Sequence, residues 1–375
     1  MRIAVNTRFL LKDKLEGIGW FTYEVLRRLV QQHPEHEFIF LFDRPYDVSF
    51  VFGDNVQPVV LIPPARHPLL WLWWFEWSVP RALRQYRADV FLSPDGHCSL
   101  RTRMPTVMVT HDIAYAHIPD LIPAKFRWYY HWFLPRHLRR ADRIVTVSEY
   151  SRQDIAKKFE LPVAKITVAC NAARPEFRPL SAAEKEAARQ LYAGGEPYFL
   201  YLGSVHPRKN VARLIQAFDA FKKETGAPIK LLIGGRLAWQ TEYVQAAHAA
   251  AAHQEAIVFL GFVPDAALPQ LVGGALALTY VSLFEGFGVP LLEAMHCEVP
   301  VITSSVTSMP EVAGPAALLV NPLDIFEMAK AMQDLYESPD LQQELIRQGR
   351  IQRERFSWDR AAAVVWQAIN DVALP

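Results

Sequence analysis

Two glutamates, Glu285 and Glu293, lie eight residues apart on either side of a glycine-containing turn that leads into a predicted helix. Pro290 suits the first position of that helix, where its missing N–H group is no loss, and Gly286 and Gly288 let the backbone come close to a ligand. The amides of residues 286–289 would point at an anion or hydroxyl group beyond the helix N-terminus. Two carboxylates with amides between them suit a hydroxyl-rich ligand. The same spacing also fits a plainer alternative, in which Glu285 caps the turn and Glu293 is a solvated helix residue.

Two adjacent cations, Arg208 and Lys209, follow the predicted strand 199–202 and precede a helix whose apolar stripe begins at Val211. Cations are disfavoured at a helix N-terminus because the helix dipole is positive there. This placement argues for an anionic ligand, which a planar guanidinium and an ammonium group would hold together. The alternative is a basic cap on the helix.

Two weaker signals occur beside strands predicted in the N-terminal half. Gly17-Ile18-Gly19 is placed between the first strand and the first helix, where it would allow close backbone approach to a phosphate. It is no dinucleotide fingerprint, because Thr22 stands where the third glycine would be. His111 follows the strand 106–110. It would either contact a ligand or act as a structural hydrogen-bonding residue that Asp112 holds.

Length and composition are those of an ordinary globular chain. The 375 residues are a natural size for two domains, and the net charge of +1 gives no electrostatic reason to propose nucleic acid as a partner. The three cysteines are far apart, so neither a disulfide framework nor a structural zinc site is expected. Residues 1–6 indicate a strand rather than a signal peptide, and no apolar run approaches the roughly 18 residues of a membrane span. We therefore expect a cytoplasmic protein.

Short apolar runs alternate with segments of helical period along the chain. This alternation predicts α/β architecture, in which two Rossmann-like halves each contain a parallel sheet with right-handed crossovers. The boundary is expected between residues 171 and 197, where prolines and glycines interrupt the pattern. The expected strands are 3–5, 38–42, 90–92, 106–110 and 143–147 in the first half, and 199–202, 230–233, 257–260, 276–279 and 301–303 in the second.

Six motifs occur in an order that resembles a known family. They are Gly17-Ile18-Gly19, Thr110-His111-Asp112, Val147-Ser148-Glu149, Leu202-Gly203-Ser204 with Pro207-Arg208-Lys209-Asn210, the segment 284–295, and Met309-Pro310-Glu311-Val312. This ordered set resembles the retaining glycosyltransferases of family 4, the group 1 nucleotide-sugar enzymes. The resemblance implies the GT-B fold, with two Rossmann-like domains whose parallel sheets face each other across a cleft. The acceptor-side domain would be residues 1–172, the nucleotide-sugar domain residues 197–356, and a terminal helix, 357–375, would pack back on the first domain.

The resemblance also assigns roles to individual residues. Arg208 and Lys209 would neutralise the donor diphosphate, His111 and Glu285 would contact the donor sugar, and Glu293 would accept from the nucleotide ribose. Further donor contacts would come from Gly17, Gly19, Gly203, Ser204, Gly286, Phe287, Gly288 and Val289. The sequence departs from the family pattern at Glu16 and Ala172, where glycine is common.

The activity that this resemblance implies is retaining transfer of a hexose from a nucleoside diphosphate sugar to an acceptor hydroxyl. GDP-mannose is the expected donor and a glycan or lipid-linked glycan the expected acceptor. No Asp-x-Asp or other metal-ligand cluster is evident in the sequence, so no metal or other cofactor is expected. Two alternatives are a catalytically silent sugar-nucleotide-binding protein and a sugar-nucleotide epimerase of the same fold.

Two stretches, 67–87 and 126–140, combine tryptophans with arginines. Tryptophan and arginine suit the headgroup region of a membrane, so both stretches are candidates for peripheral contact with the inner face of the membrane, with Trp73 and Trp74 entering the headgroup boundary. The alternative is that both form amphipathic helices whose aromatic side chains belong to the core of the first domain.

Overall fold

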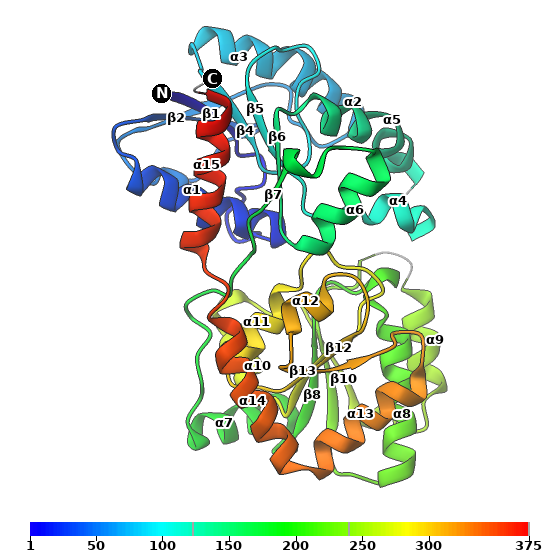
Figure 1. Ribbon diagram of the computed structural model, residues 1–375. Helices are drawn as coiled ribbons and strands as arrows, with labels where there is room; N and C mark the ends of the chain where they lie inside the picture. The colour runs from blue at the N-terminus through cyan, green and yellow to red at the C-terminus, as the bar shows by residue number, and fades with distance from the viewer. Residues whose placement is uncertain (122–123, 239–240, 374–375) are drawn as a thin grey trace. The chain divides into compact units, whose positions relative to one another are not determined.

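The computed structural model describes residues 1–121, 124–238 and 241–373. Its internal contacts divide the chain into two compact units, residues 1–171 with 357–375 and residues 172–356 (Figure 1). Residues 173–196, which the sequence analysis assigned to neither domain, belong to the second unit and include a helix, α7 (Ala182–Ala193).

A seven-stranded sheet forms the centre of the first unit. Every neighbouring pair of strands is parallel, and the spatial order is β3-β2-β1-β4-β5-β6-β7. Strands β1 to β3 therefore extend the sheet toward one edge and strands β4 to β7 extend it toward the other, and the order reverses at the junction between β1 and β4. The strands are β1 (Arg2–Asn6), β2 (Glu37–Phe42), β3 (Val56–Val60), β4 (Val90–Ser93), β5 (Thr106–Val109), β6 (Arg143–Thr146) and β7 (Ile166–Val168).

Helices cover both faces of this sheet. The helices of this unit are α1 (Gly17–Gln32), α2 (Pro68–Trp73), the π-helical turn η2 (Trp74–Ser78), α3 (Val79–Gln85), α4 (Ala114–His117), α5 (Ala124–Arg140), α6 (Glu149–Phe159) and α15 (Trp358–Ala373). Helix α15 packs against β4, β5 and β6, and α3, α5 and α6 belong to the hydrophobic cluster on the sheet. This cover on both faces explains why the central strands are buried and apolar on both sides.

The second unit contains a six-stranded sheet in the order β10-β9-β8-β11-β12-β13, again parallel throughout. The strand order of this sheet reverses at the junction between β8 and β11. The strands are β8 (Tyr198–Leu202), β9 (Lys230–Gly234), β10 (Ile257–Gly261), β11 (Ala277–Tyr280), β12 (Val301–Ser304) and β13 (Ala317–Val320).

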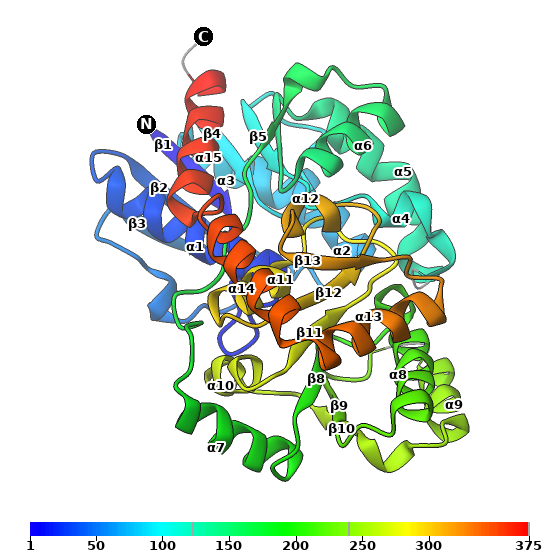
Figure 2. The ribbon, with the colours of Figure 1, turned by 60° about the horizontal axis from the view of Figure 1, so that its bottom comes forward.

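Two groups of helices pack on this second sheet, α8 with α9 and α13, and α11 with α7, α10, α12 and α14 (Figure 2). The short 3-10 turns η5 (Pro207–Lys209) and η7 (Asp265–Ala267) precede α8 and α10. The remaining bounds are α8 (Val211–Thr225), α9 (Glu242–Ala250), α10 (Leu268–Gly273), α11 (Val289–His296), α12 (Met309–Ala313), α13 (Ile325–Glu337) and α14 (Pro339–Arg353).

All ten strands expected from the sequence are present within two residues of their predicted ends. The sequence analysis missed β3, β7 and β13, and each of these is an edge strand. Edge strands are short or only partly buried, and they tolerate proline, as at Pro58 in β3. The apolar signal that marks a central strand is therefore weak in them.

The C-terminal helix α15 packs on the first unit, beside α1 (Figure 1, Figure 2). Its Trp366 ring stacks on His33 with ring centroids 3.7 Å apart, and Arg28 Nε donates to Asp359 Oδ1 over 2.8 Å. The chain thus leaves the first unit after Asn171 and returns to it at Ser357.

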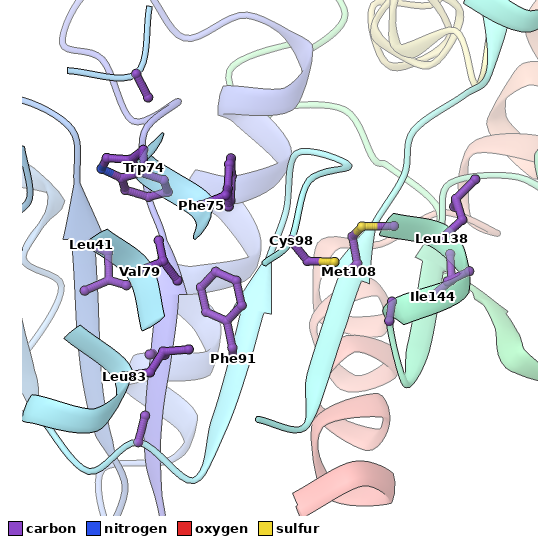
Figure 3. Packing of buried hydrophobic residues seen from close by; sticks show 14 of the residues in the cluster. Leu41, Trp74, Phe75, Val79, Leu83, Phe91, Cys98, Met108, Leu138 and Ile144 are labelled. Atoms are coloured by element: carbon purple, nitrogen blue, oxygen red, sulfur yellow. The ribbon is translucent and has the colours of Figure 1, made fainter. Parts of the chain in front are cut away.

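The aromatic residues of the two tryptophan-rich stretches divide between the core and the surface. Trp74 and Phe75 are buried in the cluster that α3, α5 and α6 form with the sheet (Figure 3). Tyr129 of α5 is also buried, whereas Trp73 is exposed. The expectation that Trp74 enters a membrane is therefore wrong, because its side chain fills the space between η2 and the strands.

Candidate active site

In a parallel sheet, ligands bind beyond the carboxyl ends of the strands, at the junction where the strand order reverses. In the second unit that junction lies between β8 and β11. The turn η5 follows β8 and carries Arg208 and Lys209, and the loop after β11 carries Glu285. The topology therefore brings these three predicted site residues to one place from segments more than 70 residues apart.

Glu285 forms a buried ion-pair cluster with both cations. Lys209 Nζ donates to Glu285 Oε1 over 2.5 Å, and Arg208 Nη1 donates to Glu285 Oε2 over 3.0 Å. Arg208 Nη1 also donates to the carbonyl oxygen of Phe284 over 2.7 Å, which fixes the guanidinium plane against the loop. Two cations share one carboxylate, so the cluster has a net positive charge.

Tyr280, the last residue of β11, completes the cluster. Its hydroxyl accepts from Lys209 Nζ over 2.5 Å and donates to Glu285 Oε1 over 3.2 Å, and the Lys209 ammonium lies 4.9 Å from its ring centroid. The ring stacks with Tyr201 of β8 at 6.2 Å. The sequence analysis missed Tyr280, since an aromatic residue at a strand end looks like an ordinary core residue.

The cations fix the protonation state of the cluster. Burial opposes the ionised form of Glu285, but Arg208 and Lys209 outweigh it and lower its pKa to about 2. Burial, followed by the same two cations, lowers the pKa of His206 to about 3. At neutral pH Glu285 is therefore an anion that orients two cations, and the adjacent imidazole is neutral. A carboxyl group with this pKa has no proton to give as a general acid.

Side chains from the segment before α12 hold the loop at Glu285. Ser308 Oγ lies 2.9 Å from the carbonyl oxygen of Glu285 and 3.1 Å from that of Phe287. Gly288 has φ +107°, and a Cβ atom there would lie 2.5 Å from Met309 Cε. Helix α11 begins at Val289, so Pro290 occupies its second position and the expectation of the first was off by one residue.

Glu293 lies in α11 and is buried. The alternative that made it a solvated helix residue is therefore wrong. Its Oε1 accepts from Arg174 Nε over 3.0 Å, and Arg174 Nη1 donates to Asp265 Oδ1 over 2.9 Å. Burial raises the pKa of Glu293, and Arg174 offsets part of this effect. The sequence analysis used residues 171–197 only as the domain boundary and so missed Arg174.

Gly203 and Ser204 follow β8 directly. Gly203 has φ +146°, and its carbonyl oxygen would lie 1.9 Å from a Cβ atom added at Gly235, so two chain segments approach each other closely here. The carbonyl oxygen of Ser204 accepts from the Tyr201 hydroxyl over 3.1 Å. Both residues are thus adjacent to the stacked tyrosine pair.

His111 follows β5 in the first unit and is partly buried. Its Nε2 lies 3.1 Å from the carbonyl oxygen of Pro94, and its ring packs edge-on against Phe21 at 5.1 Å. Because a carbonyl only accepts, Nε2 carries the proton and Nδ1 is the acceptor nitrogen of the neutral ring. Burial lowers the pKa of His111, which favours this neutral form.

Gly17 and Gly19 lie in the first turn of α1, not in a loop before the helix as the sequence analysis placed them. A Cβ atom at Gly19 would lie 2.9 Å from the carbonyl oxygen of Phe9, whereas one at Gly17 would have no atom within 4 Å. Gly19 is therefore required for packing, and Gly17 is the residue with open space beside it.

A second buried polar cluster, missed in the sequence analysis, lies at the β1–β4 junction of the first unit. Asn6 Nδ2 donates to Ser93 Oγ over 3.0 Å and to Asp95 Oδ2 over 2.8 Å, and Arg8 forms an ion pair with Asp95. Arg8 Nη2 also lies 3.2 Å from His97 Nδ1. Burial opposes ionisation of Asp95, but Arg8 lowers its pKa.

Among residues 1–121, 124–238 and 241–373 there is no group of three or more histidine, cysteine or acidic side chains arranged to hold a metal ion. Within the same ranges no helix is long and apolar enough to cross a membrane. The expectation of a reaction without a metal cofactor stays a prediction.

Comparisons with known proteins agree with this architecture. The model of the family described as Glycosyltransferase Family 4 matches residues 15–177, and the model described as Glycosyl transferases group 1 matches residues 183–352. The O-antigen chain mannosyltransferase B of Escherichia coli is 31% identical over 378 residues, which cover 96% of each chain. The O-antigen chain mannosyltransferase RfbU of Salmonella typhimurium is 30% identical over 73% of this chain and 72% of its own.

Solved structures show the same fold at low sequence identity. Anabaena HepE in complex with UDP and glucose superimposes with a TM-score of 0.77 at 17% identity and covers 99% of both chains. WaaG, a glycosyltransferase involved in lipopolysaccharide biosynthesis, superimposes with a TM-score of 0.75 at 14% identity over the whole of both chains.

Proposed function

The chain belongs to glycosyltransferase family 4 and has the GT-B fold, and on this basis we propose that it transfers mannose from GDP-mannose to a lipid-linked glycan with retention of configuration. The coarser activity, transfer of a sugar by a glycosyltransferase, follows from the family. The observation that carries the catalytic part of this proposal is the net-positive cluster that Arg208, Lys209 and Glu285 form at the strand junction of the second unit.

This cluster suits a departing nucleoside diphosphate. A guanidinium and an ammonium group held in place by a buried carboxylate need no reorganisation when negative charge develops on the leaving group, and such preorganised charges stabilise a transition state most strongly. The Lys209 ammonium faces the Glu285 carboxylate and the Tyr280 ring, which hold it in place. The cations therefore supply the charge stabilisation in this proposal, and no metal ion is assigned to it.

The proposed reaction is a displacement on one face of the sugar. The acceptor oxygen forms a bond to the anomeric carbon as the bond from that carbon to the diphosphate oxygen breaks, and the acceptor proton passes to the departing diphosphate. Glu285 is not assigned as the base, because its pKa of about 2 makes it a very weak one. It would instead accept a hydrogen bond from a hydroxyl of the donor sugar while holding Lys209 and Arg208. His111 is kept as a separate proposed contact of the donor.

The sugar and the acceptor are inferred from the relatives. Two relatives at 31% and 30% identity are named as O-antigen chain mannosyltransferases, so mannose is the proposed sugar and a growing glycan chain the proposed acceptor. The proposed location is the cytoplasmic side of the membrane. Glu293 and the residues 286–289 are proposed to bind the nucleotide and the sugar.

A thermal-shift screen against GDP-mannose, GDP, UDP-glucose and UDP tests the donor, because a ligand that binds only the folded protein raises its melting temperature. We expect the largest shift with GDP-mannose. A larger shift with UDP-glucose would contradict the assignment of the nucleotide. Incubation with GDP-mannose alone separates the proposed function from its two alternatives. The transferase should hydrolyse the donor, an epimerase would convert it to another sugar nucleotide, and a silent binding protein would leave it intact for hours.

A further inference from the structure

Four tryptophans of the first unit point away from its core. The exposed fractions are 53% for Trp73, 48% for Trp77, 41% for Trp128 and 55% for Trp132. Large aromatic side chains are normally buried, so four exposed tryptophans on neighbouring elements call for an explanation.

On each segment the exposed residues form one stripe. In α2 and η2 the stripe is Leu69, Leu70, Trp73 and Trp77, a spacing of about four residues that keeps side chains on one helix face. Trp74 and Phe75 point to the opposite face and enter the core (Figure 3). The exposed face is therefore separate from the face that stabilises the fold.

Helix α5 repeats the same division. Its exposed stripe is Arg127, Trp128, His131, Trp132, Arg136 and Arg139, while Tyr129, Leu134, His137 and Leu138 are buried. Helices α2 and α5 adjoin, because the ring of Trp71 stacks on Phe126 with ring centroids 5.5 Å apart. The two stripes thus belong to one region of the first unit, which we call the tryptophan surface.

The tryptophan surface is basic. Residues 124–140 contain no acidic side chain, and the one acidic residue among 61–87, Glu76, is buried and accepts from the backbone N–H of Leu100 over 2.9 Å. Arg127 of this surface pairs with Asp120 over 3.3 Å. The exposed arginines beside it, Arg66, Arg81, Arg84 and Arg101, form no ion pair with a carboxylate in the described part of the chain. Arg101 lies 5.0 Å from the ring centroid of Trp77, so positive charge and an aromatic ring are directly adjacent.

We infer that the tryptophan surface binds the interface of a membrane that contains anionic phospholipids. Indole rings partition into the headgroup region, and arginines beside them contact lipid phosphates. A second copy of the chain is a poorer occupant, because two such surfaces would bring like charges together. The inference rests on the proposed function in one respect only. A lipid-linked acceptor lies in the membrane, and a protein bound at the membrane interface would reach it.

Co-sedimentation with vesicles tests the inference. Vesicles of phosphatidylcholine with 30% phosphatidylglycerol should bind the wild-type protein, and pure phosphatidylcholine vesicles should bind it about tenfold or more weakly, since each arginine near an anionic surface contributes about 1 kcal/mol. The double variant Trp73→Gln with Trp77→Gln should lose about tenfold or more of its binding. Arg81→Glu with Arg84→Glu should lose binding to the anionic vesicles only.

A matched control is Tyr243→Gln with Phe326→Gln, since both residues are highly exposed aromatics of the second unit. This control should sediment like the wild type, and an equal loss would overturn the inference. Failure of the wild type to bind anionic vesicles would also overturn it, as would tryptophan-dependent self-association in analytical ultracentrifugation without vesicle binding.

The proposed function is tested separately by donor hydrolysis in solution. The Trp73/Trp77 variant should retain this activity and its melting temperature, because its substituted side chains lie outside the core. Loss of vesicle binding with intact donor hydrolysis supports the membrane inference, whereas intact vesicle binding in this variant overturns the inference and leaves the proposed function standing.

Discussion

The substitution Glu285→Gln removes the charge that holds Arg208 and Lys209 while it keeps the shape of the side chain. The amide oxygen of glutamine can still accept a hydrogen bond from one of the two cations. Its NH2 group, however, then faces the other cation, and because both groups are donors no hydrogen bond can form between them. One charge-assisted hydrogen bond is lost and one donor pair is opposed, and each such change costs about 1.5–3 kcal/mol.

The pKa of Glu285 gives a second estimate of the unfolding free energy that the substitution removes. The Glu285 side chain is 9% exposed, and its pKa falls from an ordinary 4.5 to about 2. At 1.36 kcal/mol for each factor of ten, this corresponds to about 3 kcal/mol of stability at neutral pH. The two hydrogen-bond changes together give about 3–6 kcal/mol and the lowered pKa gives about 3 kcal/mol, so we expect the Gln variant to lose about 3 kcal/mol or more from the second unit.

The pH dependence of this loss has a definite sign. The folded pKa is lower than the unfolded one, so the carboxylate stabilises the fold fully above about pH 5 and loses this effect as the pH falls toward 2. Glutamine does not titrate. The stability difference between wild type and variant should therefore be largest at pH 7 and shrink below pH 5.

Hydrogen exchange measured by mass spectrometry on peptides from β8 and β11 reports the opening free energy of this unit. The matched control is Glu344→Gln, whose exposed carboxylate also has its pKa lowered to about 2, by Arg347 and Gln348, and which should change nothing measurable. An equal effect in both variants, or a Glu285 effect that does not change between pH 7 and pH 4, would refute the reasoning.

Further predictions concern four other residues of the second unit. Lys209→Ala should lower turnover about a hundredfold or more, and Arg208→Lys should also impair it because the planar fork is lost; turnover near that of wild type at saturating donor would remove Lys209 from the mechanism. Lys209→Ala should also lower the melting temperature, since Lys209 is buried in an ion pair. Glu293→Gln should mainly weaken nucleotide binding in calorimetry, and unchanged affinity would show that the ribose assignment is wrong. Gly288→Ala should destabilise the second unit by about 1–2 kcal/mol in urea unfolding, because φ is +107° and Met309 is adjacent; an unchanged midpoint would contradict this.

The central strands and the cationic pair were predictable from the sequence because each leaves a local signal. Central strands of a parallel sheet are buried on both faces and are continuous apolar runs. Arg208 and Lys209 were predicted to bind an anionic ligand because cations are unfavourable at the start of a helix. The edge strands β3, β7 and β13 lack the first signal and were missed.

Pairings between distant segments could not be predicted in the same way. Arg8 meets Asp95 across 87 residues, and Arg174 meets Glu293 across 119. Only the fold brings such partners together. A usable signal was the presence of polar residues shortly after strand ends, since Arg8 lies two residues after β1 and Asp95 two residues after β4. For Tyr280 no such signal exists, since its hydroxyl acts on Lys209 and Glu285 from a position typical of the core.

The central claim is that Arg208 and Lys209 bind the diphosphate of the donor. Isothermal titration calorimetry of GDP and GMP, and of UDP and UMP, with wild type, Lys209→Met and the control Lys330→Met tests it most directly, since Lys330 is an exposed lysine on α13. We expect the matching diphosphate to bind wild type and the control about tenfold or more tighter than its monophosphate, and we expect most of this difference to vanish in Lys209→Met. An unchanged preference for the diphosphate in Lys209→Met would contradict the account.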